Sequence, residues 1–276
     1  MAERDYALGH SEDEENRLIR QAQLGGLTLR RLLEDAGIGR GMRVLDLGSG
    51  AGDVAFAVAE MVGQDGSVVG VDKNPSILET AQQRARTDGH ANVSWVIGDI
   101  DEQFDLDGEF DAVVGRRVLS HAADPTATLR FVLRRLVSGG VVAFQENVRR
   151  LPSRNEWAFP PSPLWGQAMA WRDQAHQLSG TRDDTGWRLY QLFLDAGLVN
   201  PQIRAHATVY AGRQGVDLWL RTNSLPSLRR ALIERGIAIE EDQDLEAVAE
   251  RLQVEFEAER KVAIDQLLFD AWAREP

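Results

Sequence analysis

The sequence predicts an α/β protein with a doubly wound, mostly parallel sheet of seven strands and a helical cap. Across residues 43–147, short β-branched or aromatic runs alternate with longer stretches whose apolar residues recur at helical spacing. This alternation is typical of parallel strands joined by crossover helices that cover both faces of the sheet. A glycine-rich turn directly after the first run marks a strand-to-helix connection of the kind that binds ligands in such sheets.

The predicted elements follow one another in a regular order. The first strand, over 43–47, leads through the glycine turn into an alanine-rich helix. After the second strand, over 67–72, Asn74 and Pro75 suit the cap and the first position of a helix that Gly89 ends. The rest of this part of the chain is predicted as strands over 93–97, 110–114 and 140–144 and helices over 54–61 and 127–137.

The flanking segments carry weaker patterns. Residues 11–37 read as two helices that meet near Gly25 and Gly26. After residue 147 the alternation ends, and 148–183 is expected to be a loop-rich insertion over one end of the sheet because it holds four prolines. The last apolar run, 266–272, fits a helix or a strand, and a strand is favoured because the strand over 201–210 needs a neighbour in the sheet. Further helices are expected over 187–196 and 225–236 and along the apolar stripe of Leu245, Val248, Leu252 and Phe256.

These elements divide the chain into four regions. Residues 1–40 form an N-terminal helical lid, and residues 41–211 form the core, with a cap insertion at about 148–183. Residues 212–260 form a second helical insertion, and residues 261–276 supply the last core strand. The lid and the two insertions together make up the expected helical cap.

Composition and charge exclude several function classes. The chain has no cysteine, which rules out disulfide scaffolds, cysteine-based zinc or iron–sulfur sites and thiol nucleophiles. Its net charge of −12 would repel DNA or RNA over most of the surface, so no nucleic-acid partner is expected. Neither a signal peptide nor a membrane-spanning apolar run is found, and a cytoplasmic protein without a membrane partner is expected.

The chemistry centres on the turn after the first strand, where Asp46 precedes three glycines, Gly48, Gly50 and Gly52. Glycine allows the backbone to take unusual dihedral angles and to lie against a ligand. The spacing is Gly-x-Gly-x-Gly, whereas a dinucleotide fingerprint reads Gly-x-Gly-x-x-Gly with a pyrophosphate at the helix N-terminus. Asp53, the next residue, would place negative charge near that phosphate, so a bound pyrophosphate is disfavoured.

Three further features follow the glycine turn in order: Asp72 at the end of the second strand, Asp99 after the third, and the fourth strand over 110–114. Together with the acidic residue and glycines of the turn, they resemble the class I S-adenosylmethionine-dependent methyltransferases. The runs over 119–125 and 136–142 are similar to the small-molecule branch that includes the ubiquinone and menaquinone methyltransferases. The resemblance implies a Rossmann-like fold, S-adenosylmethionine as cofactor and S-adenosylhomocysteine as product.

The resemblance also implies roles for individual residues near the cofactor. Asp72 would accept hydrogen bonds from both ribose hydroxyls, and Asp99 would accept one from the adenine amino group. The Ile100 N–H would address the adenine ring, and Asp46 would organise the loop or meet the cofactor's ammonium through water. The expected cofactor-binding residues are Asp46, Gly48, Ser49, Gly50, Asp72, Lys73, Asp99, Ile100 and Arg116, with Tyr6 and Gln21 closing over the cofactor.

Methyl transfer mainly requires a nucleophile aligned with the sulfonium and the exclusion of water, so no catalytic residue is compulsory. In parallel sheets the site lies outside the carboxyl ends of the strands, which nominates His121 as a general base, or else as a helix-packing residue, and Glu146 as a group that holds the substrate. Trp165, Trp171 and His176 are expected to line the acceptor site. Such tryptophans suit an aromatic, terpenoid or amine acceptor, or they pack the cap onto the core.

Some alternatives remain open at this point. No metal is expected, because metal-dependent catechol-type methyltransferases place an aspartate after the fourth strand, where this chain has Gly115-Arg116-Arg117. The acceptor atom can be O, N or C, and a homodimer is suggested only by analogy with the helical caps of such enzymes. The rival functions are a cofactor-binding regulator of the same fold without activity and a nucleotide-dependent oxidoreductase, which the glycine spacing disfavours.

Overall fold

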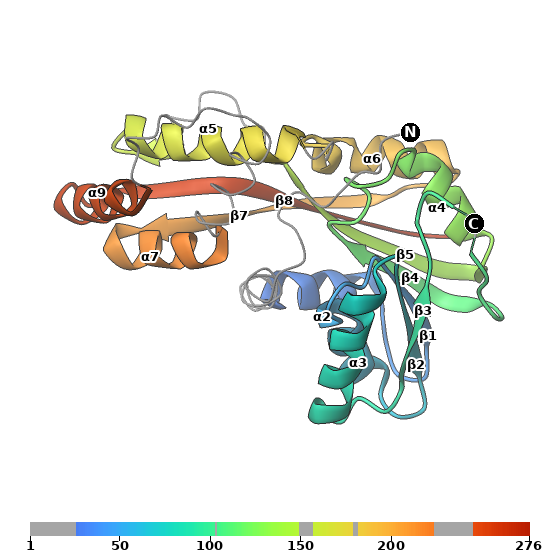
Figure 1. Ribbon diagram of the computed structural model, residues 1–276. Coiled ribbons are helices and arrows are strands. Elements are labelled where there is room, and N and C mark those ends of the chain that lie inside the picture. Colours follow the sequence, from blue (N-terminus) through green and yellow to red (C-terminus); the bar gives the residue numbers. More distant parts are fainter. Residues whose placement is uncertain (1–25, 103, 149–156, 179–181, 224–244) are drawn as a thin grey trace. The chain divides into compact units, whose positions relative to one another are not determined.

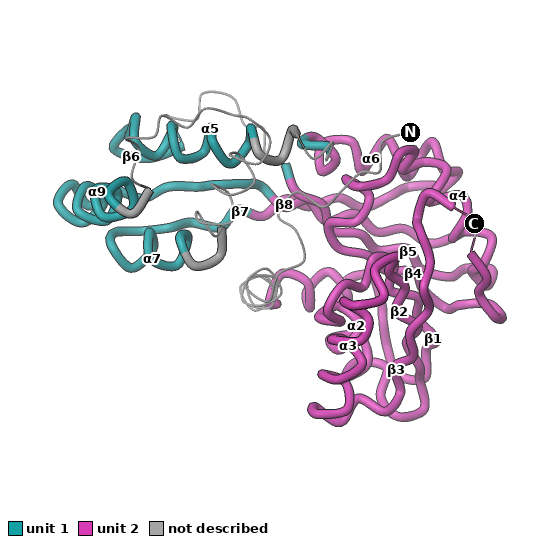
Figure 2. The backbone as a smooth tube through the Cα atoms, in the orientation of Figure 1, with its two compact units in different colours: residues 1–21, 148–183, 207–267 teal, residues 22–147, 184–206, 268–276 magenta. Residues whose placement is uncertain are grey.

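The computed structural model describes residues 26–102, 104–148, 157–178, 182–223 and 245–276. The chain divides into two compact units (Figure 2). Unit 2 consists of residues 22–147, 184–206 and 268–276, and unit 1 of residues 1–21, 148–183 and 207–267. Two strands, β7 (Gln202–Ala211) and β8 (Val262–Arg274), contribute a segment to each unit. No helix among the described residues is long and apolar enough to cross a bilayer.

Unit 2 is built on a parallel sheet whose strands are ordered β3-β2-β1-β4-β5, with β8 following β5 (Figure 1). The neighbouring pairs among its first five strands are all parallel. Because β1 lies between β2 and β4, the strand order reverses at β1, which is where doubly wound sheets open a crevice for ligands. The strands are β1 (Arg43–Leu47), β2 (Ser67–Asp72), β3 (Val93–Ile97), β4 (Phe110–Arg116) and β5 (Leu136–Val148).

Helices cover both faces of this sheet. On one face, the helix over 26–36 and α2 (Asp53–Val62) pack in a single core cluster with strand residues such as Val44 and Val114. On the other face, Phe144 of β5 meets Phe193 of α6 (Thr185–Ala196) with ring centroids 6.3 Å apart. Apolar residues therefore alternate between two covered faces, as a parallel sheet requires. The remaining helices of the unit are α3 (Pro75–Asp88) and α4 (Pro125–Leu133).

Local sequence explains where these helices begin and end. The Asn74 side chain accepts a hydrogen bond from the Ser76 N–H at the start of α3, with Pro75 at the first helical position. Gly89 ends the same helix in the left-handed conformation, at φ 80°. Asp124 caps α4 in the same way, because its side chain accepts from the first free N–H groups of that helix.

Unit 1 has its own core. Ring contacts join Trp165 of α5 (Pro163–Leu178) to Trp219 of α7 (Gly212–Asn223) at 4.9 Å and to Phe256 of α9 (Leu245–Ala258) at 5.4 Å between centroids. All three side chains are fully buried. The short strand β6 (Ala158–Phe159) pairs antiparallel with the first residues of β8.

The structure agrees with most predicted elements and corrects others. The run over 266–272 is a strand, part of β8, as favoured. The sheet has eight strands rather than seven because β6 adds a short one. The expectation of a loop-rich 148–183 is wrong for α5, since the prolines end where that helix begins and Pro163 occupies its first turn. Residues 136–137 are strand rather than helix, because β5 begins at Leu136. The predicted helices over 11–25 and 225–236 lie outside the described residues.

Candidate functional site

The glycine turn between β1 and α2 sets the geometry of the site. The Ser49 N–H donates to the Val71 carbonyl at 2.8 Å and ties the turn to β2. Gly48 and Gly50 both have positive φ, 66° and 52°, but their surroundings differ. A Cβ on Gly48 would lie 2.4 Å from Cγ2 of Val118, whereas a Cβ on Gly50 would meet nothing within 4 Å. Gly48 is therefore needed for close packing, and Gly50 presents open backbone to a ligand.

Asp72, at the carboxyl end of β2, closes the same turn from the other side. Its Oδ2 accepts a hydrogen bond from the Gly50 N–H at 3.0 Å, and its Oδ1 accepts one from the Asn74 N–H at 3.0 Å. Burial raises the pKa of this carboxyl, while the Asn74 and Gly50 amides and the charge of neighbouring Lys73 oppose that rise. Two backbone donors thus hold a carboxylate whose remaining lone pairs can accept from a diol.

Asp46 is the unusual group of the site. Its side chain is fully buried, and neither oxygen has a hydrogen-bond partner of ordinary geometry among the described residues. Burial raises the pKa of Asp46 well above its ordinary value, the Ala55 amide opposes this, and the charges of Asp72 and Asp53 add to it. The nearby Ser49 hydroxyl is also buried without a described partner. Buried polar groups without partners are costly, and a ligand with an ammonium or hydroxyl group would satisfy these two.

An ion pair that the sequence did not suggest braces the turn. Arg84 of α3 donates to Oδ1 of Asp53 at 2.8 Å and to the Ala51 carbonyl at 2.6 Å. Arg84 also lies over the ring of Phe56, 5.2 Å from its centroid. Asp53 therefore holds α3 against the turn, which gives this acidic residue a structural role.

The loop after β3 positions the two residues expected at the adenine. Oδ1 of Asp99 accepts from the Asp101 N–H at 3.0 Å, and the Ile100 carbonyl accepts from the Thr128 hydroxyl at 3.1 Å. Both residues are half-buried. Oδ1 of Asp101 in turn accepts from the Ala123 N–H at 2.6 Å, which links this loop to the segment after β4.

Arg116 ends β4 and pairs in register with Gln145 on β5. Register partners on parallel strands point to the same face. Burial lowers the pKa of Arg116, and the charges of Asp53 and Asp270 oppose the shift, so the guanidinium lies under the influence of both the glycine turn and β8. Its Nε and one terminal nitrogen are buried without a described hydrogen-bond partner.

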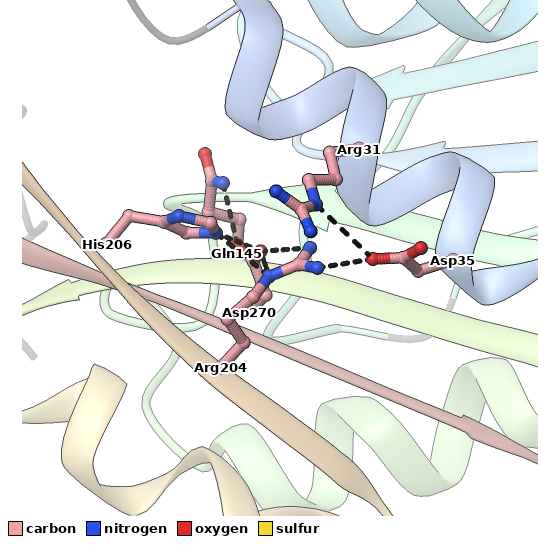
Figure 3. Close-up of polar contacts among 6 residues, drawn as sticks. All are labelled: Arg31, Asp35, Gln145, Arg204, His206 and Asp270. Atoms are coloured by element: carbon pink, nitrogen blue, oxygen red, sulfur yellow. Dashed lines mark hydrogen bonds and ion pairs between the residues drawn. The ribbon is translucent and has the colours of Figure 1, made fainter.

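Next to Arg116 lies a polar network that sequence reasoning missed (Figure 3). Asp270 of β8 is fully buried. Its Oδ1 accepts from Nε2 of Gln145 at 2.8 Å, and its Oδ2 lies 2.6 Å from Nε2 of His206 and 2.9 Å from Nη2 of Arg204. Arg204 also contacts Asp35 of the helix over 26–36. The available signals were a single carboxylate inside the apolar run 267–272 and the alternation of Arg204 and His206 along β7.

The two predicted catalytic residues lie after β4 and at the end of β5. Oε1 of Glu146 accepts from the N–H groups of Val118 and Leu119 at 2.8 and 2.7 Å, and the side chain is fully buried. This geometry makes Glu146 the anchor of the turn that follows β4. His121 is half-buried. Its backbone N–H donates to the Val118 carbonyl at 3.0 Å, so His121 belongs to the turn that Glu146 holds.

The predicted acceptor residues all lie in unit 1 and are not brought together with the glycine turn within one unit. Trp165 is fully buried in the core of unit 1, so its placement favours packing over an open pocket. Trp171 is partly buried against the same core. His176 lies in α5 at a position where no side chain is described, and Tyr6 and Gln21 lie outside the described residues. No cluster of three metal-ligating side chains occurs in the described ranges.

The sequence profile of a family described as "Methyltransferase domain" matches residues 38–187, more than half of the chain. An arsenite methyltransferase of Halobacterium salinarum is 29% identical over 157 residues, which cover 57% of this chain and 40% of that protein. The ubiquinone/menaquinone biosynthesis C-methyltransferase UbiE of Pseudomonas fluorescens is 32% identical over 178 residues, which cover 60% and 68% of the two chains. The matched regions span between 33% and 69% of the lengths of the curated relatives.

The fold comparison agrees with the sequence matches. A solved Bacillus halodurans structure assigned to the methyltransferases has a TM-score of 0.60 at 20% identity, and the match covers 90% of this chain and 98% of that one. The strand order, the glycine turn and the acidic residues that end the first strands lie within the matched family region. The chain therefore belongs to the methyltransferase domain family and has the Rossmann-like fold of the class I S-adenosylmethionine-dependent methyltransferases.

Proposed function

We propose that this protein transfers the methyl group of S-adenosylmethionine to a small-molecule acceptor and releases S-adenosylhomocysteine. One observation carries the proposal. The Asp72 carboxylate is fixed by the amides of Gly50 and Asn74, beside the open face of Gly50 and the unpartnered carboxylate of Asp46. Acceptors for a diol and for an ammonium thus stand at one turn, and S-adenosylmethionine carries both groups.

Different residues would bind different parts of the cofactor. Asp72 would hold the ribose hydroxyls, since a carboxylate accepts such bonds with charge assistance. From the loop after β3, Asp99 would accept a hydrogen bond from the adenine amino group, and the Ile100 N–H would contact the adenine ring. Gly48, Ser49 and Gly50 would lie along the methionine part, with Asp46 below them and Arg116 at its border. Lys73 would remain beside the ribose site as a counter-charge to Asp72.

Bound S-adenosylmethionine would supply an already activated methyl group, so the protein's part is alignment and exclusion of water. Glu146 would act through the backbone, because its two amide contacts fix the turn that carries His121. His121 would face the acceptor from that turn. Tyr6 and Gln21 would close over the cofactor from the N-terminal segment.

The acceptor is proposed to be a small molecule. The relatives named above are arsenite and quinone C-methyltransferases, which leaves O-, N- and C-methylation within the range of this fold. The net charge of −12 argues against a nucleic-acid acceptor. Trp171 and His176 remain proposed acceptor contacts, and a homodimer and a cytoplasmic location remain expectations from the sequence.

The test is isothermal titration calorimetry with S-adenosylhomocysteine and, separately, with NADH. We expect the wild-type protein to bind S-adenosylhomocysteine and not NADH. Asp72→Ala should weaken that affinity by about 10- to 100-fold, since a charge-assisted hydrogen-bonding group is lost. The matched control is Asp88→Ala, an exposed aspartate at the end of α3, which should leave the affinity unchanged. Binding of NADH alone, or an unchanged affinity in Asp72→Ala, would overturn the proposal.

A further inference from the structure

The pair formed by His206 and Asp270 has the geometry of an oriented base. The 2.6 Å separation between Nε2 of His206 and Oδ2 of Asp270 requires a shared proton. Gln145 and Arg204 both donate to Asp270, and Nε of Arg204 lies 3.2 Å from Oδ2 of Asp270 and 3.1 Å from Nε2 of His206. Since the guanidinium can only donate and the carboxylate accepts from it, we place the proton of the 2.6 Å contact on Nε2 of His206. The other ring nitrogen, Nδ1, then carries a lone pair.

The imidazole that carries this lone pair is partly exposed. The His206 side chain is 18% exposed, whereas Asp270 behind it is fully buried. Among the described residues, nothing makes a hydrogen bond to Nδ1 of His206. The arrangement is that of a base with one nitrogen held by a buried carboxylate and the other without a hydrogen bond from the described residues.

Through Gln145, the pair is linked to the carboxyl ends of β4 and β5. Gln145 and Arg116 are register partners at the carboxyl ends of β5 and β4, and Gln145 touches Asp270. A row of polar groups therefore runs from the border of the cofactor turn across β5 and β8 to His206 on β7. The unpartnered nitrogens of Arg116 and the buried, unpartnered Oε1 of Gln145 lie along this row.

We propose that His206, held by Asp270, is the general base for a methyl acceptor that carries a phenolic or enolic hydroxyl. This inference rests on the proposed methyltransferase function. In the transfer, the acceptor O–H gives its proton to Nδ1 of His206 and an oxygen electron pair forms the new O–C bond. The S–C bond breaks, and its electron pair stays on sulfur, which becomes the neutral thioether. The imidazolium then releases the proton to water.

The charged groups near the proposed base favour a hydroxyl acceptor over an amine acceptor. The Arg116 guanidinium, whose Nε and Nη2 have no hydrogen-bond partner among the described residues, would stabilise the oxyanion that forms as the hydroxyl loses its proton, and it would repel an ammonium acceptor. Arg204 is already neutralised by Asp270 and Asp35. Around His206, the charged groups are Asp270 from β8, Arg204 on its own strand and, through Arg204, Asp35 with Arg31 from the helix over 26–36.

The experiment measures methyl transfer from radiolabelled S-adenosylmethionine to two matched panels. One panel holds catechol, 4-hydroxybenzoate and 1,3-cyclohexanedione, and the other holds aniline, benzylamine and ethanolamine. We expect transfer to hydroxyl acceptors, with kcat lowered about 100-fold or more in His206→Ala, the usual contribution of a general base. The affinity of that variant for S-adenosylhomocysteine should stay within about twofold of wild type, which also shows that the variant is folded.

Three further readouts separate a base from a structural residue. In wild type, kcat should rise with pH along a limb that is absent in His206→Ala, and added imidazole should partly restore kcat in that variant. Asp270→Asn, which alters a positioning residue, should displace the same limb. His90→Ala is the matched control, because His90 stacks on Phe56 away from the network, and its kcat should not change.

The outcomes are distinct. Failure to bind S-adenosylhomocysteine would refute the proposed function itself. Normal binding with transfer only to amines, or to neither panel, would overturn the inference about His206 alone. So would a His206→Ala variant that keeps its kcat and pH limb while His121→Ala loses them.

Discussion

At the scale of single residues, Asp46 is a buried carboxylate whose cost to stability a bound ligand would offset. A carboxylate that is fully buried without a described partner destabilises the folded state, and sites of this kind are common where a ligand completes the structure. The cost is largest when the carboxyl is ionised. The loss of stability caused by this carboxylate can therefore be measured as a function of pH.

We expect Asp46→Asn to raise the free energy of unfolding of the ligand-free protein at pH 7 by about 1–3 kcal/mol, because the variant removes the buried negative charge. Burial raises the pKa of Asp46 in the folded state, so the folded protein binds the extra proton. Wild-type stability should then fall as pH rises from the ordinary aspartate pKa towards the raised value, and the variant should lack this component.

Urea unfolding between pH 4 and pH 8 measures the difference. Asp88→Asn, a change of the same type at an exposed site, serves as the control. A less stable Asp46→Asn at pH 7 would show that the carboxylate has stabilising partners in the folded protein. Calorimetry should also find weaker S-adenosylhomocysteine binding by Asp46→Asn.

At the scale of elements, Gly48 and Gly50 look equivalent in the sequence but have different roles in the turn between β1 and α2. Gly48→Ala should cost about 2–4 kcal/mol, because its Cβ would overlap Val118 and its φ is positive. Gly50→Ala should cost only about 1 kcal/mol, from the left-handed conformation alone. The effects on S-adenosylhomocysteine affinity should have the opposite order, so that Gly50→Ala weakens binding more than Gly48→Ala does.

Chemical denaturation and calorimetry on both variants check this pair. The double variant Gly48→Ala/Val118→Ala should recover part of the lost stability, because the overlapping methyl groups are removed. Equal stability losses at the two glycines would mean that Val118 moves aside at little cost.

At the scale of the whole molecule, each unit has its own buried core, and the residues assigned to the cofactor within the described ranges belong to unit 2. Phe256→Ala in unit 1 should cost about 3–5 kcal/mol, as for other buried aromatic truncations. Hydrogen exchange should lose protection within residues 157–178, 207–223 and 245–267, while S-adenosylhomocysteine affinity stays within about twofold of wild type.

The exposed Val254 of the same helix provides the control, since Val254→Ala should change stability by no more than about 0.5 kcal/mol. Loss of cofactor affinity in parallel with the loss of protection in unit 1 would show instead that the two cores are coupled.

The parts of this protein that depend on near neighbours were predictable from its sequence. The alternation over 43–147 predicted the parallel sheet, and the Asn74-Pro75 pair predicted the start of α3. The resemblance that includes the glycine turn, Asp46 and Asp72 predicted the family. Turns, helix caps and hydrophobic periodicity depend on residues only a few positions apart, so the local sequence determines them.

Only the tertiary structure decided which distant residues meet. The order of β5, β8 and β7 brings together Gln145, Asp270 and His206, which are more than 60 residues apart along the chain. It also turned Glu146 towards two backbone amides and Trp165 into the core of unit 1. Strand pairing sets these contacts, and no local pattern encodes which strand lies beside which, so the network around Asp270 became visible only in three dimensions.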